Sequence, residues 1–274
     1  MPSPRRLTDR AALSQHRARA RRSARPADFL HRIARLEVED RLAEVNRTFT
    51  NPAIVTGWPE FWADLRPDAR ILPDEDRLDL EPGAHDLIVH AMSLHWADDP
   101  VGQIVQSARA LRPDGLFLAA LPGGETLAPL RAALMQAEAE VSGGASPRVL
   151  PMAEIRDLGG LLARGGLALP VADLVSQQAS YRDALHLMRD LRDMGENNAL
   201  ADRLRHPTRR TVLARAAEIY AAANPDPDAP GRVLARFDLI FLTGWAPSEN
   251  QQKPLRPGSA RTSLAAALNA RSTP

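Results

Sequence analysis

The sequence predicts an α/β fold with a doubly wound, mostly parallel sheet, and three observations carry this prediction. Short apolar runs alternate with helical patterns from residue 53 onward, as in parallel strands joined by helices. The runs "HDLIVHAM" and "LFLAAL" indicate buried strands. A last apolar run, 236–247, follows two helical segments and is expected to add an antiparallel strand to the sheet.

The individual elements follow from local signals. Residues 28–48 place apolar side chains at mostly helical spacing, with Asp28 as the expected N-cap. The run "AIVTG" predicts a short strand, and Pro59 suits the first turn of the helix after it. Further parallel strands are expected at 69–72, 86–92 and 116–121. Later helices are expected at 99–111, 125–141, 152–165, 183–195 and 207–223, with a late strand at 167–180.

Three regions are predicted along the chain. Residues 1–50 form a basic, helical N-terminal extension, and residues 51–247 form the α/β domain. A helical insertion at about 183–223 is expected to cap the edge of the sheet where ligands bind. Residues 248–274 form a polar C-terminal tail.

The composition excludes several classes of protein. With 44% hydrophobic and 25% charged residues, the 274-residue chain is typical of a soluble globular protein. It has no cysteine, which excludes disulfides, thiolate metal sites and a cysteine nucleophile. No apolar run approaches the roughly 18 residues of a membrane span, and the N-terminal segment lacks the apolar core of a signal peptide. We therefore expect a cytoplasmic location, in a bacterium.

The N-terminal segment is strongly basic. Residues 1–35 hold ten arginines and two aspartates, a net charge of about +8, whereas the whole chain has a net charge of +1. Such an arm can contact an anionic membrane surface or an acidic partner, and it is also compatible with a solvated helical extension. We expect no DNA binding, a peripheral contact of the arm with the inner membrane, and an arm (residues 1–25) that is loosely packed and dispensable for folding.

His95 and Trp96 follow the strand 86–92, at the edge of the sheet where open α/β proteins bind ligands. We expect His95 to take a polar role near a substrate; the alternative is that His95 caps the next helix and Trp96 packs the loop. His90, His95 and Asp98 have a spacing that matches no standard metal site, so no metal is expected.

Residues 71–121 carry a resemblance to a known family. The order of an acidic loop, "HDLIVHAMSLHW", a helix and "LRPDG" before an apolar strand resembles the class I S-adenosylmethionine-dependent methyltransferases, including the acyl-carrier-protein methyltransferase of biotin synthesis. The resemblance implies a Rossmann-like sheet and S-adenosylmethionine as cofactor. It also implies that Asp74, followed by Glu75, lies by the adenine, and that His90 and Ala91 lie where their strand meets the cofactor.

One branch of this family is more similar still. The segments "SPRVLPMAEIRDLGGLL" and "LTGWAPSENQQKPLRPGSA" resemble methyltransferase-fold proteins that assist assembly of respiratory complex I. This resemblance implies a protein substrate or respiratory-complex subunit as partner, and either methyl transfer to a side chain or hydroxylation of arginine. The alternative is a non-catalytic assembly factor that keeps the fold without the cofactor.

The sequence departs from the family in its first half. Members hold the methionine part of the cofactor on a loop with several glycines after the first strand, whereas here Gly57 is the only glycine before Gly83. Only twenty positions, 53–72, are available where the family has two strand-helix-strand units. We therefore expect a sheet truncated at this edge, and binding of S-adenosylmethionine no tighter than about millimolar.

Overall fold

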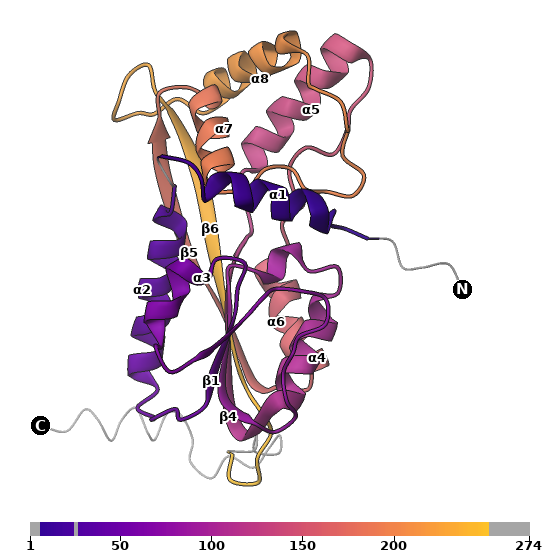
Figure 1. Cartoon of the computed structure of the whole chain (residues 1–274). Coiled ribbons are helices and arrows are strands. Elements are labelled where there is room, and N and C mark those ends of the chain that lie inside the picture. Colours follow the sequence, from indigo (N-terminus) through magenta and orange to yellow (C-terminus); the bar gives the residue numbers. More distant parts are fainter. Residues whose placement is uncertain (1–5, 25–26, 252–274) are drawn as a thin grey trace, which may run out of the picture.

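The computed structural model, shown in Figure 1, describes residues 6–24 and 27–251. A six-stranded sheet forms its centre, in the order β2-β1-β3-β4-β6-β5. Its strands are β1 (Pro52–Val55), β2 (Arg70–Leu72), β3 (His85–Ala91), β4 (Leu111–Gly123), β5 (Ala168–Tyr181) and β6 (Val233–Trp245). The first four are parallel, and β6 is antiparallel to both β4 and β5. The predicted fold class is therefore confirmed.

The sheet is short at the β2 edge. β1 has four residues and β2 only three, and β2 pairs with β1 alone. A four-residue helix, α3 (Pro59–Trp62), and a single 3₁₀ turn, Ala63–Leu65, make the whole connection between these strands. Pro59 begins α3 as expected, because its fixed φ suits the first helical turn. The twenty positions 53–72 thus hold one short strand-helix-strand unit, as the sequence predicted.

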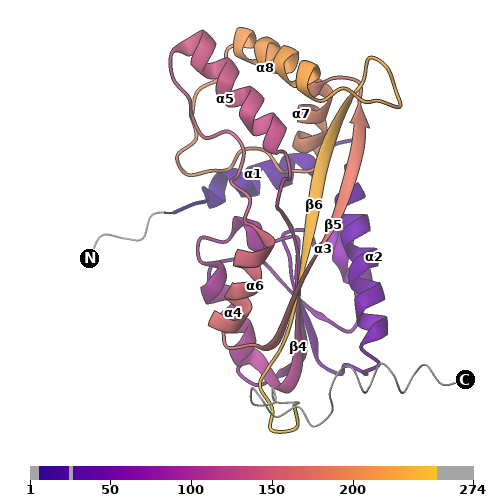
Figure 2. The same cartoon turned by 180° about the vertical axis from the view of Figure 1, so that it is seen from behind.

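Helices cover both faces of the sheet (Figures 1 and 2). α2 (Phe29–Glu44) and α3 pack on one face, whereas α4 (Pro100–Ala110) and α6 (Ile155–Arg164) pack on the other. Strand alternation divides β3 between the two layers, because neighbouring side chains point to opposite faces. Leu87 and Val89 join the α2 layer, and Ile88 joins the α4 layer.

A helical cap lies beyond the end of the sheet where the parallel strands finish. It consists of α5 (Ala128–Ser142), α7 (Ala184–Asp193) and α8 (Arg210–Ala223), at the top of Figure 1. α1 (Arg10–Ala20) lies crosswise between this cap and the sheet. The edge where an open α/β sheet binds ligands is therefore bordered by the cap and by α1.

The expectation of a loosely packed arm is wrong for the part of the arm that the structure describes. Thr8, Leu13, Arg17 and Ala20 are all buried, and the Thr8 hydroxyl donates to the Trp96 carbonyl over 2.8 Å. The sequence did not predict this packing because the arm is highly charged and has few apolar side chains to bury. The arginines themselves supply the other anchors.

Asp28 is the N-cap residue of α2, as expected, but its side chain does not cap the helix. It accepts no hydrogen bond from the first turn, and its backbone (φ −104°, ψ 2°) is not in the extended region that suits a side-chain cap. The carboxylate instead forms an ion pair with Arg32, one turn along the helix, at 3.3 Å.

Two buried histidines make stability depend on pH. Burial lowers the pKa of His31 and of His90 from 6.5 to about 4. His31 Nδ1 accepts a hydrogen bond from Trp62 Nε1 (3.0 Å), and His90 Nε2 lies 2.9 Å from the Ser107 hydroxyl. Because the folded pKa lies below the unfolded value, the stabilising effect of the neutral rings is complete above pH 6.5. It is lost as the pH falls from 6.5 toward 4.

At pH 5 the expected loss is about 2 kcal/mol for each ring. Thermal melts at pH 7 and pH 5 measure it. A variant carrying His31→Gln and His90→Gln, which keeps an acceptor for Trp62, should lose less stability between these pH values than the unchanged chain. The variant His206→Gln, at an exposed histidine, is the control. Equal losses in all three proteins would contradict the prediction.

Candidate functional site

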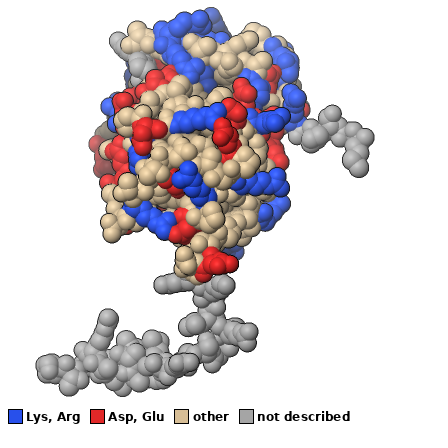
Figure 3. All heavy atoms as spheres, turned by 60° about the horizontal axis from the view of Figure 1, so that its bottom comes forward, with Lys and Arg blue, Asp and Glu red and all other residues tan. Residues whose placement is uncertain are grey.

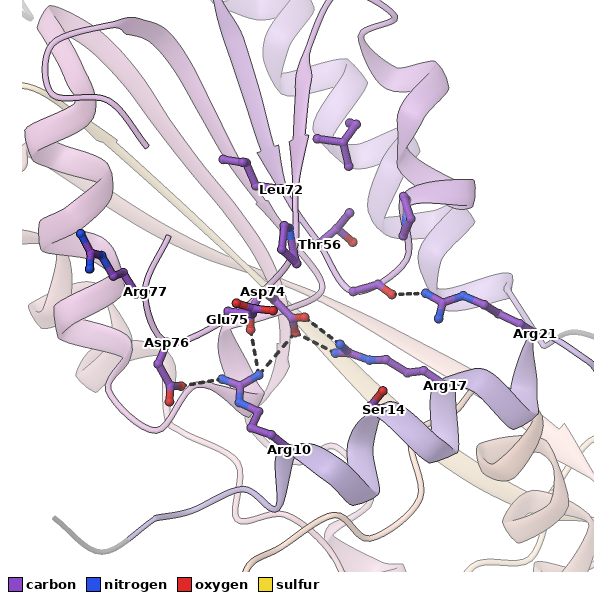
Figure 4. A pocket seen from close by; sticks show the side chains of 14 residues that line it. Arg10, Ser14, Arg17, Arg21, Thr56, Leu72, Asp74, Glu75, Asp76 and Arg77 are labelled. Carbon is purple, nitrogen blue, oxygen red and sulfur yellow. Dashed lines mark hydrogen bonds and ion pairs between the residues drawn. The ribbon is translucent and has the colours of Figure 1, made fainter. Parts of the chain in front are cut away.

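A polar cavity of about 790 Å³ lies where β1 and β2 end. One helix face, the turn after β1 and the segment after β2 line it (Figure 4). The helix face belongs to α1, whose Arg10, Ser14, Arg17 and Arg21 recur at the three- and four-residue spacing that brings side chains to one side. The cationic face of α1 is thereby directed at the acidic segment that begins at Asp74.

Arg17 and Asp74 form a bidentate ion pair in this cavity. Arg17 Nη1 donates to Oδ1 over 2.7 Å and Nη2 donates to Oδ2 over 2.8 Å. Both side chains are buried, with 7% and 9% of their surface exposed. Burial lowers the pKa of Arg17, and the bonds to Asp74 more than reverse that effect, so the guanidinium stays charged. Arg10 adds a bond to the Asp74 carbonyl (2.8 Å).

The turn after β1 is packed against the same helix. A Cβ built on Gly57 would lie 2.0 Å from Arg17 Nη1, so the guanidinium rests directly on the Gly57 backbone. Arg21 donates to the Gly57 carbonyl and lies 4.8 Å from the centre of the Trp58 ring. Trp58 itself is buried and stacks on Phe61 at 5.4 Å. Arg17, Arg21 and the two aromatic rings therefore pack around this turn, on the wall of the polar cavity.

A second cavity, of about 290 Å³, is mainly apolar and lies between the end of the sheet and the cap. Four methionines and several leucines line it, together with His95, Trp96 and Glu196. The methionines are Met92, Met152, Met188 and Met194. Flexible thioether side chains adapt to a ligand, so this wall suits a long aliphatic group.

Glu196 is the carboxylate of the apolar cavity. Its Oε2 accepts a hydrogen bond from Trp96 Nε1 (2.7 Å) and lies 3.2 Å from His95 Nε2. Burial raises the pKa of Glu196, but His95, Arg17 and Trp96 together outweigh this effect and lower the pKa to about 2. Its side chain retains 21% of its surface exposed. A charged carboxylate is therefore held beside apolar walls at neutral pH.

The residues predicted from sequence divide between these cavities and the core. Gly57, Asp74 and Glu75 line the polar cavity, and His95 lines the apolar one. His90 and Ala91 are fully buried, and His90 points to Ser107 on the α4 face. The alternation of side chains along β3 predicts this face for His90, because His90 lies two residues after Ile88, which packs in the α4 layer.

Two side chains that shape these cavities, Arg17 and Glu196, are not among the residues predicted from the sequence. The composition places Arg17 in a solvated arm, although the helical spacing of Arg10, Ser14, Arg17 and Arg21 could have revealed it. Glu196 lies in the loop "MGENN", 100 residues or more from Trp96 and His95, and no local pattern links them. Within residues 6–24 and 27–251, no group of three His, Asp or Glu side chains could hold a metal ion, and no helix could cross a membrane.

The polar cavity does not fit S-adenosylmethionine held in the manner that the resemblance implies. Both oxygens of Asp74 are bound by Arg17, and the same guanidinium covers Gly57. Trp58 stands next to Gly57 in place of a small residue. No reaction step can therefore be derived through that cofactor in this arrangement.

Comparison with known proteins gives relatives by sequence. The chain is 38% identical over 195 residues to the arginine-hydroxylase NDUFAF5, mitochondrial, of Danio rerio, covering 71% of this chain and 60% of that protein. The human protein of the same name is 38% identical over 198 residues (72% of this chain, 56% of that protein). A malonyl-[acyl-carrier protein] O-methyltransferase from Laribacter hongkongensis is 30% identical over 193 residues (70% and 62%). The chain thus spans about 60% of the length of these relatives.

Solved structures give weaker likenesses. The YcgJ protein from Bacillus subtilis aligns with a TM-score of 0.47 at 10% identity, covering 77% of this chain and 99% of that one. Phosphoethanolamine N-methyltransferase 2 from Haemonchus contortus aligns with a TM-score of 0.40 at 9% identity (77% and 53%). No protein-family model matches the chain. By sequence, the chain resembles the class I methyltransferase-fold proteins and, among these relatives, most of all the NDUFAF5 arginine-hydroxylases, over about 70% of its own length.

Proposed function

We propose that this chain binds an arginine side chain of a protein, a respiratory complex I subunit, during assembly of that complex. The apolar cavity is the binding site, and Glu196 is the group that holds the guanidinium. The observation that carries the proposal is a charged carboxylate kept beside an apolar, methionine-rich wall.

The chemistry of the cavity matches arginine in two respects. The aliphatic stem of arginine packs on methionine and leucine, while its guanidinium seeks a carboxylate. Glu196 uses Oε2 for Trp96 and His95, and no hydrogen bond to Oε1 occurs within residues 6–24 and 27–251. That oxygen is available to a ligand donor. Arg148 also lines the cavity, but Glu138 neutralises it through bonds of 2.5 and 3.0 Å.

His95 takes a supporting part in this proposal. Its side chain is 4% exposed, and its Nδ1 is buried with no hydrogen-bond partner among the described residues. The His95 Nε2 atom and Trp96 Nε1 both contact Oε2 of Glu196 and so hold the carboxylate in place. A carboxylate held by two side chains loses little freedom when a guanidinium arrives, which favours binding.

The substrate class and the cellular location are proposed from the sequence relatives. Their printed name, arginine-hydroxylase, is compatible with an arginine-binding cavity, and they are named as mitochondrial. For this chain we propose the bacterial cytoplasm, at the inner membrane. Arg10, Arg17 and Arg21 are engaged in ion pairs, so a peripheral membrane contact of the arm would use its other arginines. On the face in Figure 3, described side chains of both charge signs are interspersed.

The test uses peptides that differ at one side chain. A short peptide with a single arginine is titrated against the full chain, and compared with the same peptide carrying citrulline, which has nearly the same shape without the charge. Glu196→Gln should weaken binding of the arginine peptide about 10- to 100-fold, because a charged hydrogen bond is lost. Binding of the citrulline peptide should change much less.

The matched control is Glu218→Gln, a glutamate on α8 whose side chain is 67% exposed. It should bind both peptides as the unchanged chain does. Calorimetry gives the dissociation constants, and the tryptophan fluorescence, to which Trp96 contributes from the cavity wall, gives a second reading. Equal affinity of the unchanged chain for the arginine and citrulline peptides would refute the proposal.

A further inference from the structure

We infer that α1 blocks, from within the chain, the contacts that this fold offers a cofactor, because Arg17 takes both carboxylate oxygens of Asp74 and covers Gly57. The chain consequently does not take up S-adenosylmethionine. The inference goes beyond the proposed function, because it concerns the polar cavity and not the apolar one.

The first argument is the position of α1. The chain passes from β1 outward to β2, and then returns to β3 and β4 on the other side of β1. The reversal of direction lies between β1 and β3, and open α/β sheets bind ligands just beyond the carboxyl ends of the strands at such a point. The turn at Gly57 lies just after β1, and Arg17 rests on it.

The second argument is the strength of the contact. Arg17 meets both carboxylate oxygens of Asp74 in a buried, bidentate pair, and Arg10 holds the Asp74 carbonyl. A ligand that is to reach Asp74 or the Gly57 backbone must first expel Arg17. Expulsion would separate two buried charges, which is strongly unfavourable unless the ligand replaces every bond.

The third argument is that two glycines allow close packing around α1 and Trp58. A side chain at Gly57 would meet the Arg17 guanidinium at 2.0 to 2.7 Å. Gly195, with φ +76°, would meet Trp58 at 2.7 Å and the Arg17 Cα at 3.2 Å. Both glycines therefore let α1 and Trp58 approach closely. Gly57 is a docking position for α1, and not the remnant of a working cofactor loop.

The experiment has two parts. In the first, the full chain is titrated calorimetrically with S-adenosylmethionine and with S-adenosylhomocysteine, each up to about millimolar concentration. We expect no saturable heat and no rise in melting temperature with either compound. Stoichiometric micromolar binding that Asp74→Asn abolishes would overturn the inference. Such a result would not contradict the proposed binding of arginine, because that proposal is tested separately, by the affinity of Glu196→Gln for the arginine and citrulline peptides.

The second part tests the role of Gly57 by a double-mutant cycle. Gly57→Ala in the unchanged chain should lower the melting temperature by roughly 3 °C or more, because the new methyl group forces Arg17 off Asp74. In an Arg17→Ala background the same substitution should have almost no effect. Gly160→Ala, at a helical glycine with no atom within 4 Å of the added Cβ, is the control. An equal loss from Gly57→Ala in both backgrounds would show that Gly57 does not serve Arg17.

Discussion

Replacing Asp74 by alanine is expected to lower the free energy of unfolding by about 3–5 kcal/mol, the usual cost of removing one partner of a buried ion pair. The substitution leaves the Arg17 guanidinium, 7% exposed, without its carboxylate. The lost attraction between Arg17 and Asp74 accounts for little of this free energy. Most of it is the charge that remains buried and unpaired, in a place where water reaches it poorly.

Urea denaturation of Asp74→Ala measures this loss. Asp76→Ala is the matched control, because Asp76 also pairs with an arginine of α1, at 3.1 Å, but is 59% exposed. An exposed pair contributes only about 0–1 kcal/mol. The double variant Arg17→Met with Asp74→Leu should recover much of the stability, since both charges are then removed together. If Asp74→Ala and Asp76→Ala cost the same, the pair is not buried in solution.

Removal of residues 1–20 is expected to lower the melting temperature by roughly 5–10 °C. This reverses the expectation drawn from the sequence. The deletion uncovers the cluster in which Leu13 packs with Trp96 and Leu200, and it removes the bonds that Leu7 and Thr8 donate to Asp98. Loss of a buried leucine alone typically costs about 2–5 kcal/mol, partly offset by the chain entropy regained.

Differential scanning calorimetry of the truncated chain gives the result. Removal of residues 1–5, which lie outside the described ranges, is the matched truncation and should leave the melting temperature nearly unchanged. An unchanged melting temperature after removal of residues 1–20 would mean that α1 is not docked in solution. The arm would then be the solvated extension that its composition indicates.

The strands could be predicted because their signal is local. "HDLIVHAM" and "LFLAAL" are apolar on both faces of the strand. Such a run can be identified as a buried strand without knowing which strands and helices cover it. Their ends were less certain. β4 begins at Leu111, because Leu111 pairs with His85, but the next pair along is Leu87 with Leu116. The residues "RPDG" between these two pairs, with Asp114 at φ +65°, form an irregularity in the strand.

The site could be predicted only in part, because its decisive contacts join distant segments. Asp74 and His95 were found through positions that the fold fixes relative to its strands. Arg17 meets Asp74 across 57 positions, and Glu196 meets His95 across 101. Helical spacing reveals that α1 has a cationic face, but not which acidic segment that face meets. The composition of the N-terminal segment therefore predicted a solvated arm, whereas in the structure α1 packs against the domain and lines the polar cavity.

The docking of α1 also sets an order of events during synthesis. The helix is made first, but Asp9 bonds through its backbone N–H to the Ala199 carbonyl (2.7 Å) and through its side chain to Arg203, 194 positions away. At about 5–20 residues per second, roughly 10–40 s pass between translation of α1 and translation of these partners. The sheet strands β1 to β4 leave the ribosome within that interval. Until the residues around 195–203 are made, a nascent chain therefore lacks these two bonds of Asp9 and the close approach of Gly195 to Trp58.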